Sequence, residues 1–219
     1  MPKKHIYFVP GLAANSKIFE RISLPKETFE VHFLEWIIPN SRKESIEAYA
    51  KRLSLHITHN NPILIGVSFG GVMVQEISKL ICFEKVIIIS SIKSRKELPK
   101  RLKLAQKTGL YKLFPSKTVQ NIEHYKSLMF TDFLKKRAEL YKTYLSVRDP
   151  KYIEWAIDTI LNWQQEEPLE YVQHIHGNKD EVFPYKNIHD AIEISKGSHV
   201  MIINKAKTIS KILADECVK

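Results

Sequence analysis

Short apolar runs alternate with helical stripes along the first part of the chain. The runs at 5–9, 29–38, 62–67 and 85–90 have strand length and are bounded by turn residues, which predicts buried strands. Residues 41–57 and 68–81 carry apolar side chains at helical spacing instead. Ser41, with Glu44 three residues later, can cap the first of these helices. Strands and helices in alternation predict βαβ units and a parallel sheet.

The pattern changes near Lys93 and changes back near Pro168. Helical stripes fill this stretch, and Thr131 or Asp132 can cap one of the helices. Asp149 before Pro150 predicts the start of another. Strands at 170–176 and 191–195 and a helix at 208–216 then follow. We therefore predict an α/β core formed by 1–92 and 169–219, with 93–168 inserted as a helical unit.

Composition narrows the class of protein. A chain of 219 residues with 44% hydrophobic and 26% charged residues is typical of one globular domain. Its two cysteines, Cys82 and Cys217, exclude a disulfide scaffold and a four-cysteine zinc site, and they fit a reducing compartment. Apolar runs stay well short of the ~18 residues of a membrane span. The apolar stretch 6–9 is too short for a signal peptide, so we expect a cytoplasmic protein.

The positive charge is concentrated in the predicted insert. The chain has a net charge of +10. Residues 93–151 hold 16 Lys/Arg and 5 Asp/Glu, whereas the rest of the chain holds 18 and 19. An anionic substrate or an acidic surface is therefore expected to approach the insert rather than the core.

The segment from Gly66 to Gly71 is the most informative motif. It reads Gly-Val-Ser-Phe-Gly-Gly, matches Gly-x-Ser-x-Gly, and stands directly after a predicted strand and before a predicted helix. A serine hydroxyl on such a sharp turn stands clear of the sheet, where a base can take its proton. Glycines on both sides leave room for the turn. Ser68 is therefore the candidate nucleophile.

A serine nucleophile needs a histidine and usually a carboxylate. His199 lies on a loop before the apolar run 200–203, and Asp180 and Glu181 lie on a loop directly after the strand at 170–176. Ligands of open α/β sheets bind at such positions. Composition alone does not decide between the two carboxylates.

These motifs resemble the α/β-hydrolase superfamily. The matching residues are Val9-Pro10-Gly11-Leu12, the Gly66–Gly71 motif, Gly177-Asn178-Lys179-Asp180 with Pro184, and Gly197-Ser198-His199. The chain order Ser68, Asp180, His199 is the one expected for a triad of this fold. The resemblance implies Ser68 as nucleophile, His199 as base and Asp180 as its partner. It also implies a mostly parallel sheet flanked by helices, shortened here to about six strands, and a helical cap at 93–168.

This chain departs from the family pattern at the oxyanion hole. Many members carry His-Gly in the oxyanion loop, whereas this chain has Pro10-Gly11. Because backbone N–H groups bind the oxyanion, we assign this role to the amides of Leu12 and Phe69. The side chain of Phe69 is bulky and could shape the pocket.

The function expected from these residues is that of a carboxylesterase-like serine hydrolase that forms an acyl-enzyme and uses neither a metal nor an organic cofactor. The alternatives are a thioesterase or a lysophospholipase acting on an anionic acyl substrate. From another class, a non-catalytic module could bind anionic partners, including a membrane surface, through the basic insert; direct nucleic-acid binding is disfavoured because no phosphate loop or nucleic-acid motif occurs. His174 and His176 lack a third metal ligand of suitable spacing, which favours a structural role. The sequence indicates no oligomeric state.

Overall fold

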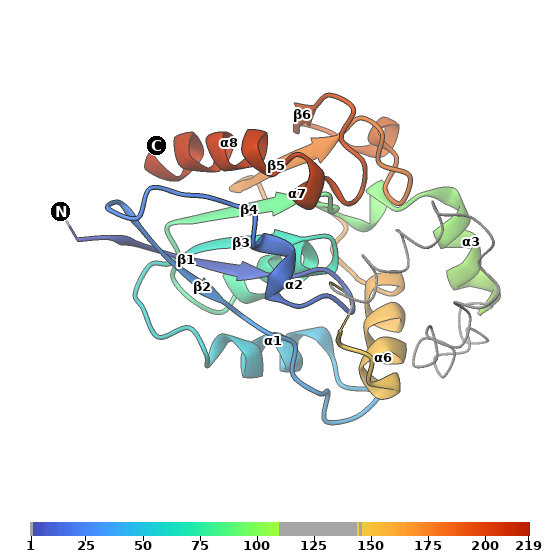
Figure 1. The fold of residues 1–219 in the computed structure, drawn as a ribbon. Coiled ribbons are helices and arrows are strands. Elements are labelled where there is room, and N and C mark those ends of the chain that lie inside the picture. Colours follow the sequence, from blue (N-terminus) through green and yellow to red (C-terminus); the bar gives the residue numbers. More distant parts are fainter. Residues whose placement is uncertain (1, 110–143, 145) are drawn as a thin grey trace, which may run out of the picture.

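The sheet is the centre of the fold. A computed structural model describes residues 2–109, 144 and 146–219 (Figure 1). In this part of the chain six strands form one sheet in the order β2-β1-β3-β4-β5-β6, and every neighbouring pair is parallel. The predicted shortened sheet is thus confirmed. The strands are β1 (Lys4–Val9), β2 (Phe29–Phe33), β3 (Ile63–Val67), β4 (Lys85–Ile89), β5 (Val172–Gly177) and β6 (Ile192–Ile194).

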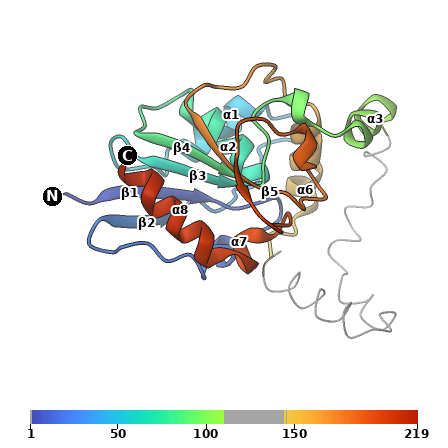
Figure 2. The ribbon, with the colours of Figure 1, turned by 90° about the horizontal axis from the view of Figure 1, so that it is seen from above.

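Helices cover both faces of the sheet, with α1 and α2 on one face and α8 on the other (Figures 1 and 2). Short 3₁₀ turns lie between β1 and β2 at Ser16–Phe19, between β4 and α3 at Arg95–Glu97, and between β5 and β6 at Tyr185–Asn187. The α-helices are α1 (Ile46–Ser54), α2 (Phe69–Ser78), α3 (Lys100–Thr108), α6 (Pro150–Leu161), α7 (Met201–Asn204) and α8 (Ala206–Val218).

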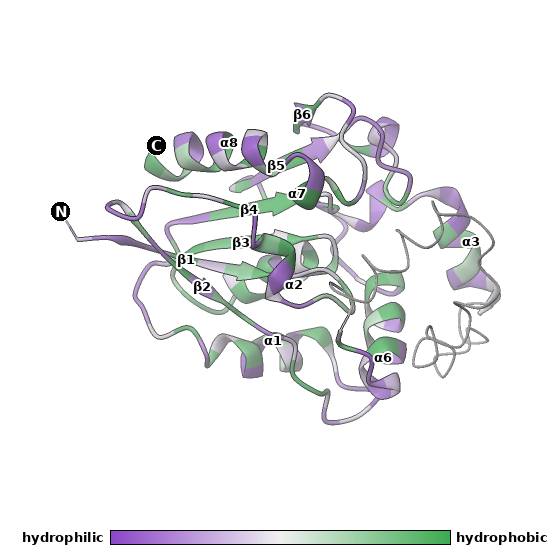
Figure 3. Cartoon of the chain, in the orientation of Figure 1, coloured by the Kyte–Doolittle hydropathy of each residue, from purple (hydrophilic) through white to green (hydrophobic). Residues whose placement is uncertain are grey.

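Alternating side chains of the central strands pack into two cores, one on each side of the sheet. In β1, Tyr7 and Val9 face α1 and α2, whereas Ile6 and Phe8 face α8. Both sides are buried, which explains why the strand sequences are continuously apolar rather than alternating (Figure 3). Each fully buried aliphatic or aromatic side chain contributes roughly 1.5–3 kcal/mol relative to an exposed one.

Two predicted elements are markedly shorter in the structure. The helix expected at 41–57 is shorter, because Ser45 rather than Ser41 caps it: Ser45 Oγ accepts the N–H of Ala48 at 3.2 Å. Glu44, expected to complete the Ser41 cap, instead accepts bonds from the Arg52 guanidinium at 2.8 and 2.9 Å. The strand expected at 29–38 ends at Phe33, where its pairing with β1 ends.

The described part of the insert is helical, as expected. Between Lys93 and Pro168, the described residues contain no strand. Asp149 caps α6 by accepting the N–H of Tyr152 at 3.0 Å. In α6, Trp155 stacks on Tyr49 of α1 at 4.1 Å and donates its indole N–H to the carbonyl oxygen of Glu44 at 2.8 Å. The helix expected to start at Thr131 or Asp132 lies outside the described residues, and the division into core and cap remains a prediction.

The two cysteines lie in different environments. Cys82 is exposed between α2 and β4, whereas Cys217 is buried in α8. Burial raises the pKa of the Cys217 thiol to about 12. Among the described residues, every helix is too short or too polar to cross a bilayer.

Candidate active site

Ser68 occupies a sharp turn between β3 and α2. Its φ of 53° and ψ of −118° lie in a region that non-glycine residues rarely adopt. The flanking glycines make the turn possible. A Cβ on Gly66 would lie 2.1 Å from the carbonyl oxygen of Gly70, and one on Gly70 would lie 2.3 Å from the carbonyl oxygen of Val9. The motif therefore has the strand-turn-helix context that its sequence predicted.

Strand β4 and its following turn fix the backbone of this serine. The Ser68 N–H donates to the carbonyl oxygen of Ile89 at 2.9 Å, and Ser91 Oγ donates to the carbonyl oxygen of Ser68 at 2.7 Å. Ser91 was not singled out from the sequence, because a serine in a turn carries no motif of its own. Its position against Ser68 depends on the pairing of β3 with β4.

The structure brings the three predicted triad residues together. Ser68 Oγ lies 3.0 Å from His199 Nε2, and His199 Nδ1 lies 2.9 Å from Asp180 Oδ2. Ser68 follows β3, Asp180 follows β5 and His199 follows β6, so all three stand at the carboxyl ends of parallel strands. Such an edge is where ligands of open α/β sheets bind.

The carboxylate of Asp180 is held in one orientation. Its side chain is completely buried, and Oδ1 accepts the N–H groups of Val182 at 2.8 Å and Phe183 at 2.9 Å. Oδ2 is thereby directed at His199. Glu181, the competing carboxylate in the sequence, is exposed to solvent. The structure therefore selects Asp180 as the carboxylate that meets the histidine.

Two further histidines lie behind this carboxylate. His176 Nε2 donates to the carbonyl oxygen of Phe183 at 2.9 Å and lies 3.5 Å from Asp180 Oδ2. His176 Nδ1 then accepts from His174 Nε2 at 3.0 Å. Burial lowers the pKa of both imidazoles, so they are neutral near pH 7. The pair supports the loop that carries Asp180, in line with the structural role expected from the sequence.

Phe183 connects these features. Its backbone N–H and carbonyl oxygen bind Asp180 and His176, and its ring packs edge-on against His199, with centroids 5.5 Å apart. The ring is buried and restricts the movement of the imidazole. Sequence reasoning placed Phe183 in the correct loop but gave it no role.

The two predicted oxyanion residues belong to segments that adjoin the serine. Leu12 belongs to the loop after β1, and a Cβ on the neighbouring Gly11 would lie 3.5 Å from Ser68 Cβ. Trp36 Nε1 holds this loop by donating to the carbonyl oxygen of Gly11 at 2.9 Å. Phe69 is the first residue of α2, where backbone N–H groups lack helical partners.

The side chain of Phe69 is placed differently from the expectation that it could shape the pocket. It is fully buried and stacks on Trp36 at 5.1 Å, with Trp155 edge-on at 5.8 Å. It thus acts on the site by fixing the start of α2 against the core. Next to it, the chain that leads into α6 contacts the loop after β1, since the N–H of Val147 donates to the carbonyl oxygen of Ala13 at 3.0 Å.

Comparison with known proteins identifies the fold. No family model and no curated protein sequence matches the chain. Solved structures do match: an enol-lactonase from Burkholderia xenovorans LB400 gives a TM-score of 0.68 at 14% identity, over 100% of this chain and 93% of that one. A structure from a study of carboxylesterases of the thaumarchaeon Nitrososphaera gargenis gives 0.65 at 18% identity, over 99% and 90%. A thermophilic esterase from Thermogutta terrifontis gives 0.63 at 10% identity, over 98% and 89%.

These similarities, together with the strand order and the turn at Ser68, show that the chain has the α/β-hydrolase fold. The expectation of this fold from the sequence is confirmed. At such low identities the likeness concerns the fold alone, so the chemistry has to be argued from the residues of this chain.

Proposed function

We propose that the protein is a serine hydrolase that cleaves an ester bond through Ser68, His199 and Asp180. The observation that carries the proposal is the continuous hydrogen-bonded chain from Ser68 Oγ through the imidazole of His199 to the buried carboxylate of Asp180. Such a chain activates a serine that would otherwise be a poor nucleophile.

The chemistry takes place in two halves. Ser68 Oγ forms a bond to the acyl carbon while its proton passes to His199 Nε2, and Asp180 stabilises the imidazolium. The tetrahedral intermediate collapses, the bond to the leaving oxygen breaks, and that oxygen takes the proton from His199. Water, deprotonated by His199, then attacks the acyl-enzyme and releases the acid with Ser68 restored. No metal or organic cofactor takes part in these steps.

We assign the binding of the oxyanion to the backbone N–H groups of Leu12 and Phe69. Each donor of this kind lowers the barrier by roughly 3 kcal/mol. Two observations support the assignment: Trp36 holds the carbonyl group of Gly11 next to Leu12, and Phe69 opens α2 directly after the nucleophile. The positive end of the helix dipole adds to the stabilisation of negative charge there.

Labelling with a fluorophosphonate probe tests the nucleophile. The wild-type protein should be labelled and should hydrolyse p-nitrophenyl esters, whereas Ser68→Ala should do neither. Ser91→Ala removes the hydroxyl that binds the Ser68 carbonyl oxygen but leaves the nucleophile and its base in place, so this variant should still be labelled. A Ser68→Ala protein that is labelled and turns over normally would refute the proposal. A folded wild-type protein that is inert to the probe would favour the non-catalytic binding module.

We assign the substrate to the carboxylic esters that have a short or medium acyl chain. The names of the similar structures, an enol-lactonase and esterases, are consistent with an oxygen ester. A panel of oxygen esters and thioesters of graded length, with Ser68→Ala as the blank, separates the esterase from a thioesterase. Higher kcat/KM on the thioesters throughout the panel would overturn the choice of ester.

An anionic acyl substrate is the second candidate, and the position of α3 favours it. Arg101 in this helix donates to the carbonyl oxygens of Glu181 and Val182, next to Asp180. Lys100 and Lys107 of α3 are exposed. The double substitution Lys100→Gln/Lys107→Gln should therefore lower kcat/KM for an anionic ester and weaken its salt dependence. Lys207→Gln/Lys211→Gln on α8 is the matched control. If the α3 variant keeps the wild-type activity and salt dependence, the charge there serves only solubility.

A further inference from the structure

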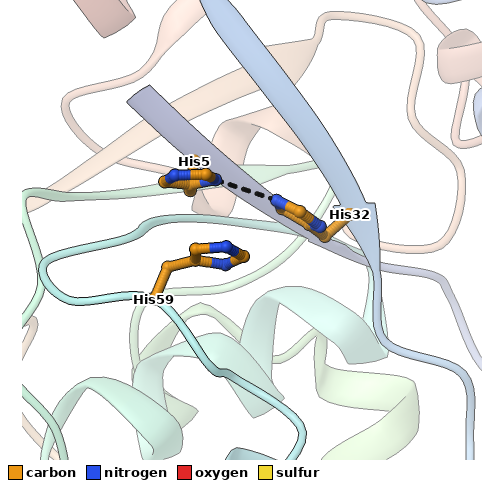
Figure 4. Close-up of side chains that lie close together, drawn as sticks. All are labelled: His5, His32 and His59. Carbon is orange, nitrogen blue, oxygen red and sulfur yellow. Dashed lines mark hydrogen bonds between the residues drawn. The ribbon is translucent and has the colours of Figure 1, made fainter. Parts of the chain in front are cut away.

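Three histidines from distant parts of the sequence meet at the amino end of the sheet. His5 lies in β1, His32 in β2 and His59 in the connection between α1 and β3 (Figure 4). One nitrogen from each imidazole can be chosen so that all three nitrogens lie within 4.8 Å of one another. His5 Nδ1 lies 3.0 Å from His32 Nε2.

The parallel register builds this cluster. Glu30 is paired with His5, and His32 is paired with Tyr7. Because paired residues of neighbouring strands point to the same face, and side chains repeat on that face every second residue, all four side chains project together. His59 joins them from the connection between α1 and β3, with its ring stacked on His5 at a centroid distance of 3.6 Å.

The imidazoles of the cluster can be reached from solvent. The side chains are partly accessible, 25% for His5 and 23% for His32, so an ion can approach them. Imidazole nitrogens are among the commonest protein ligands of transition metals.

Tyr7 can orient the third imidazole. Its hydroxyl oxygen lies 2.6 Å from His59 Nδ1 and accepts the N–H of Thr58 at 3.1 Å. When the Tyr7 proton is directed to Thr58 Oγ1 at 3.3 Å, the Tyr7 oxygen accepts from His59 Nδ1. His59 Nε2 is then left with a lone pair. A second hydrogen-bonded partner of this kind is typical of metal-binding histidines.

Glu30 supplies a carboxylate at the same place. Glu30 Oε2 lies 3.9 Å from His5 Nδ1, and Glu30 Oε1 lies 3.9 Å from His32 Nε2. Ligand atoms of a tetrahedral zinc ion stand about 3.3 Å apart when each bond is about 2.0–2.1 Å. The imidazole nitrogens lie within 4.8 Å of one another, so the side chains have to draw closer around an ion. The stacked rings of His5 and His59 also have to tilt, so that both lone pairs point at it.

We propose that His5, His32 and His59, with Glu30 as the fourth ligand, form a binding site for a divalent transition-metal ion, with Zn²⁺ as the preferred ion. Imidazole and carboxylate donors in tetrahedral arrangement suit Zn²⁺. The ion would join the edge strand β2 to β1 and to the connection before β3. It would stand apart from the triad, since His5 and Val9 are separated by about 13 Å along β1 at ~3.3 Å per residue.

Calorimetric titration of Zn²⁺ into the metal-free full-length protein, prepared without a polyhistidine tag, tests the site. The wild-type protein should bind one equivalent. His59→Gln and His5→Gln should each bind at least about tenfold more weakly, since even indirect partners of a metal ligand change affinity by about 10–100-fold. The matched control is His56→Gln, an exposed histidine three residues from His59, and it should bind as the wild type does.

The melting temperature gives an independent measurement. At a Zn²⁺ concentration about a hundred times the Kd, the wild type and His56→Gln should melt about 5–10 °C higher than without metal. His59→Gln should show little of this shift, and its own melt without metal shows whether it is folded. The proposal would be overturned if the wild type bound no Zn²⁺ or if His59→Gln bound Zn²⁺ with the wild-type affinity. It would also be overturned if His56→Gln lost as much Zn²⁺ affinity as His59→Gln.

Two controls separate this site from the triad. His199→Gln should retain Zn²⁺ binding, and loss of binding in that variant would place the ion at the triad instead. Fluorophosphonate labelling of Ser68 should be unchanged after treatment with a chelator. Failure of the metal site and failure of the proposed hydrolase activity are thus observed in different experiments.

Discussion

Replacing Asp180 by asparagine should disable the base without disturbing the fold. Both N–H groups that contact Oδ1, from Val182 and Phe183, are donors at 2.8 and 2.9 Å, so the amide oxygen of an asparagine must take this position. The NH₂ group is then directed at His199 Nδ1, which Oδ2 contacts at 2.9 Å in the wild type. His199 has to accept there, and its proton moves to Nε2, opposite Ser68 Oγ.

The size of the effect follows from these contacts. With its proton on Nε2, His199 cannot accept from Ser68. If the amide of the new asparagine turned over to restore the correct tautomer, its NH₂ group would face the buried N–H groups of Val182 and Phe183. Each of these unpaired N–H groups would cost roughly 1–3 kcal/mol of stability. The imidazolium would also lose its carboxylate. A loss of about 10⁴ in kcat is the usual result of such a tautomer change, which corresponds to roughly 5.4 kcal/mol of barrier.

The assay is hydrolysis of a p-nitrophenyl ester by Asp180→Asn, with Glu181→Gln as the matched control. Glu181 is the adjacent carboxylate and is exposed, so its substitution should leave kcat/KM within about twofold. Melting temperatures check that both variants are folded. An Asp180→Asn protein with activity within tenfold of the wild type would refute the reasoning, and so would an equal loss in Glu181→Gln.

Other substitutions test the fold. Ser45→Ala removes the cap of α1 and should lower stability by about 1 kcal/mol, seen as a fall of roughly 2–4 °C in melting temperature. Gly66→Ala would place a Cβ 2.1 Å from a backbone oxygen, so it should destabilise more than Gly109→Ala, where, among the described residues and apart from the glycine's local backbone, no atom lies within 4 Å of the added Cβ and the φ of 68° is strained. The urea midpoints of the two variants give the comparison. Burial holds the pKa of His174 well below 6.5, so the unfolded chain binds a proton that the folded one does not, and stability should fall as the pH drops below about 6.5. His174→Gln should reduce this slope in melts between about pH 7 and about pH 5; an unchanged slope would contradict the assignment.

The sequence predicted the triad because each member stands on a loop that follows a strand. The apolar runs before Ser68 and Asp180 are long enough to read as strands, and parallel strands place their carboxyl ends at one edge. The choice between Asp180 and Glu181 needed the resemblance, since it depends on which side chain turns into the loop and meets the N–H groups of Val182 and Phe183.

Local signals misplaced one helix start and one strand end. Ser41 and Glu44 have the spacing of a capping box, but Glu44 binds Arg52 and the N–H of Asn40, at 2.6 Å for the latter, and Ser45 takes over the cap. Residues 34–38 are apolar enough for a strand. Trp36 instead turns inward to bind the carbonyl oxygen of Gly11, a tertiary contact that no local pattern contains.

The histidine cluster could not be predicted from spacing. His5, His32 and His59 are 27 residues apart at each step and fit no metal-binding motif. Their meeting depends on the exact pairing of Tyr7 with His32, and a shift of one residue would turn His32 to the other face of the sheet. Register is set by the whole sheet, so it is invisible in any short stretch of sequence.

The contrast between the two cysteines provides a chemical handle. Thiolates react and thiols do not, so Cys217, buried and with its pKa raised to about 12, is protected from maleimides and iodoacetamides in the folded protein. Cys82 is exposed, in the connection between α2 and β4, at the opposite end of α2 from Ser68. A fluorophore or spin label can therefore be attached at one defined point, remote from the nucleophile, without removing any native residue.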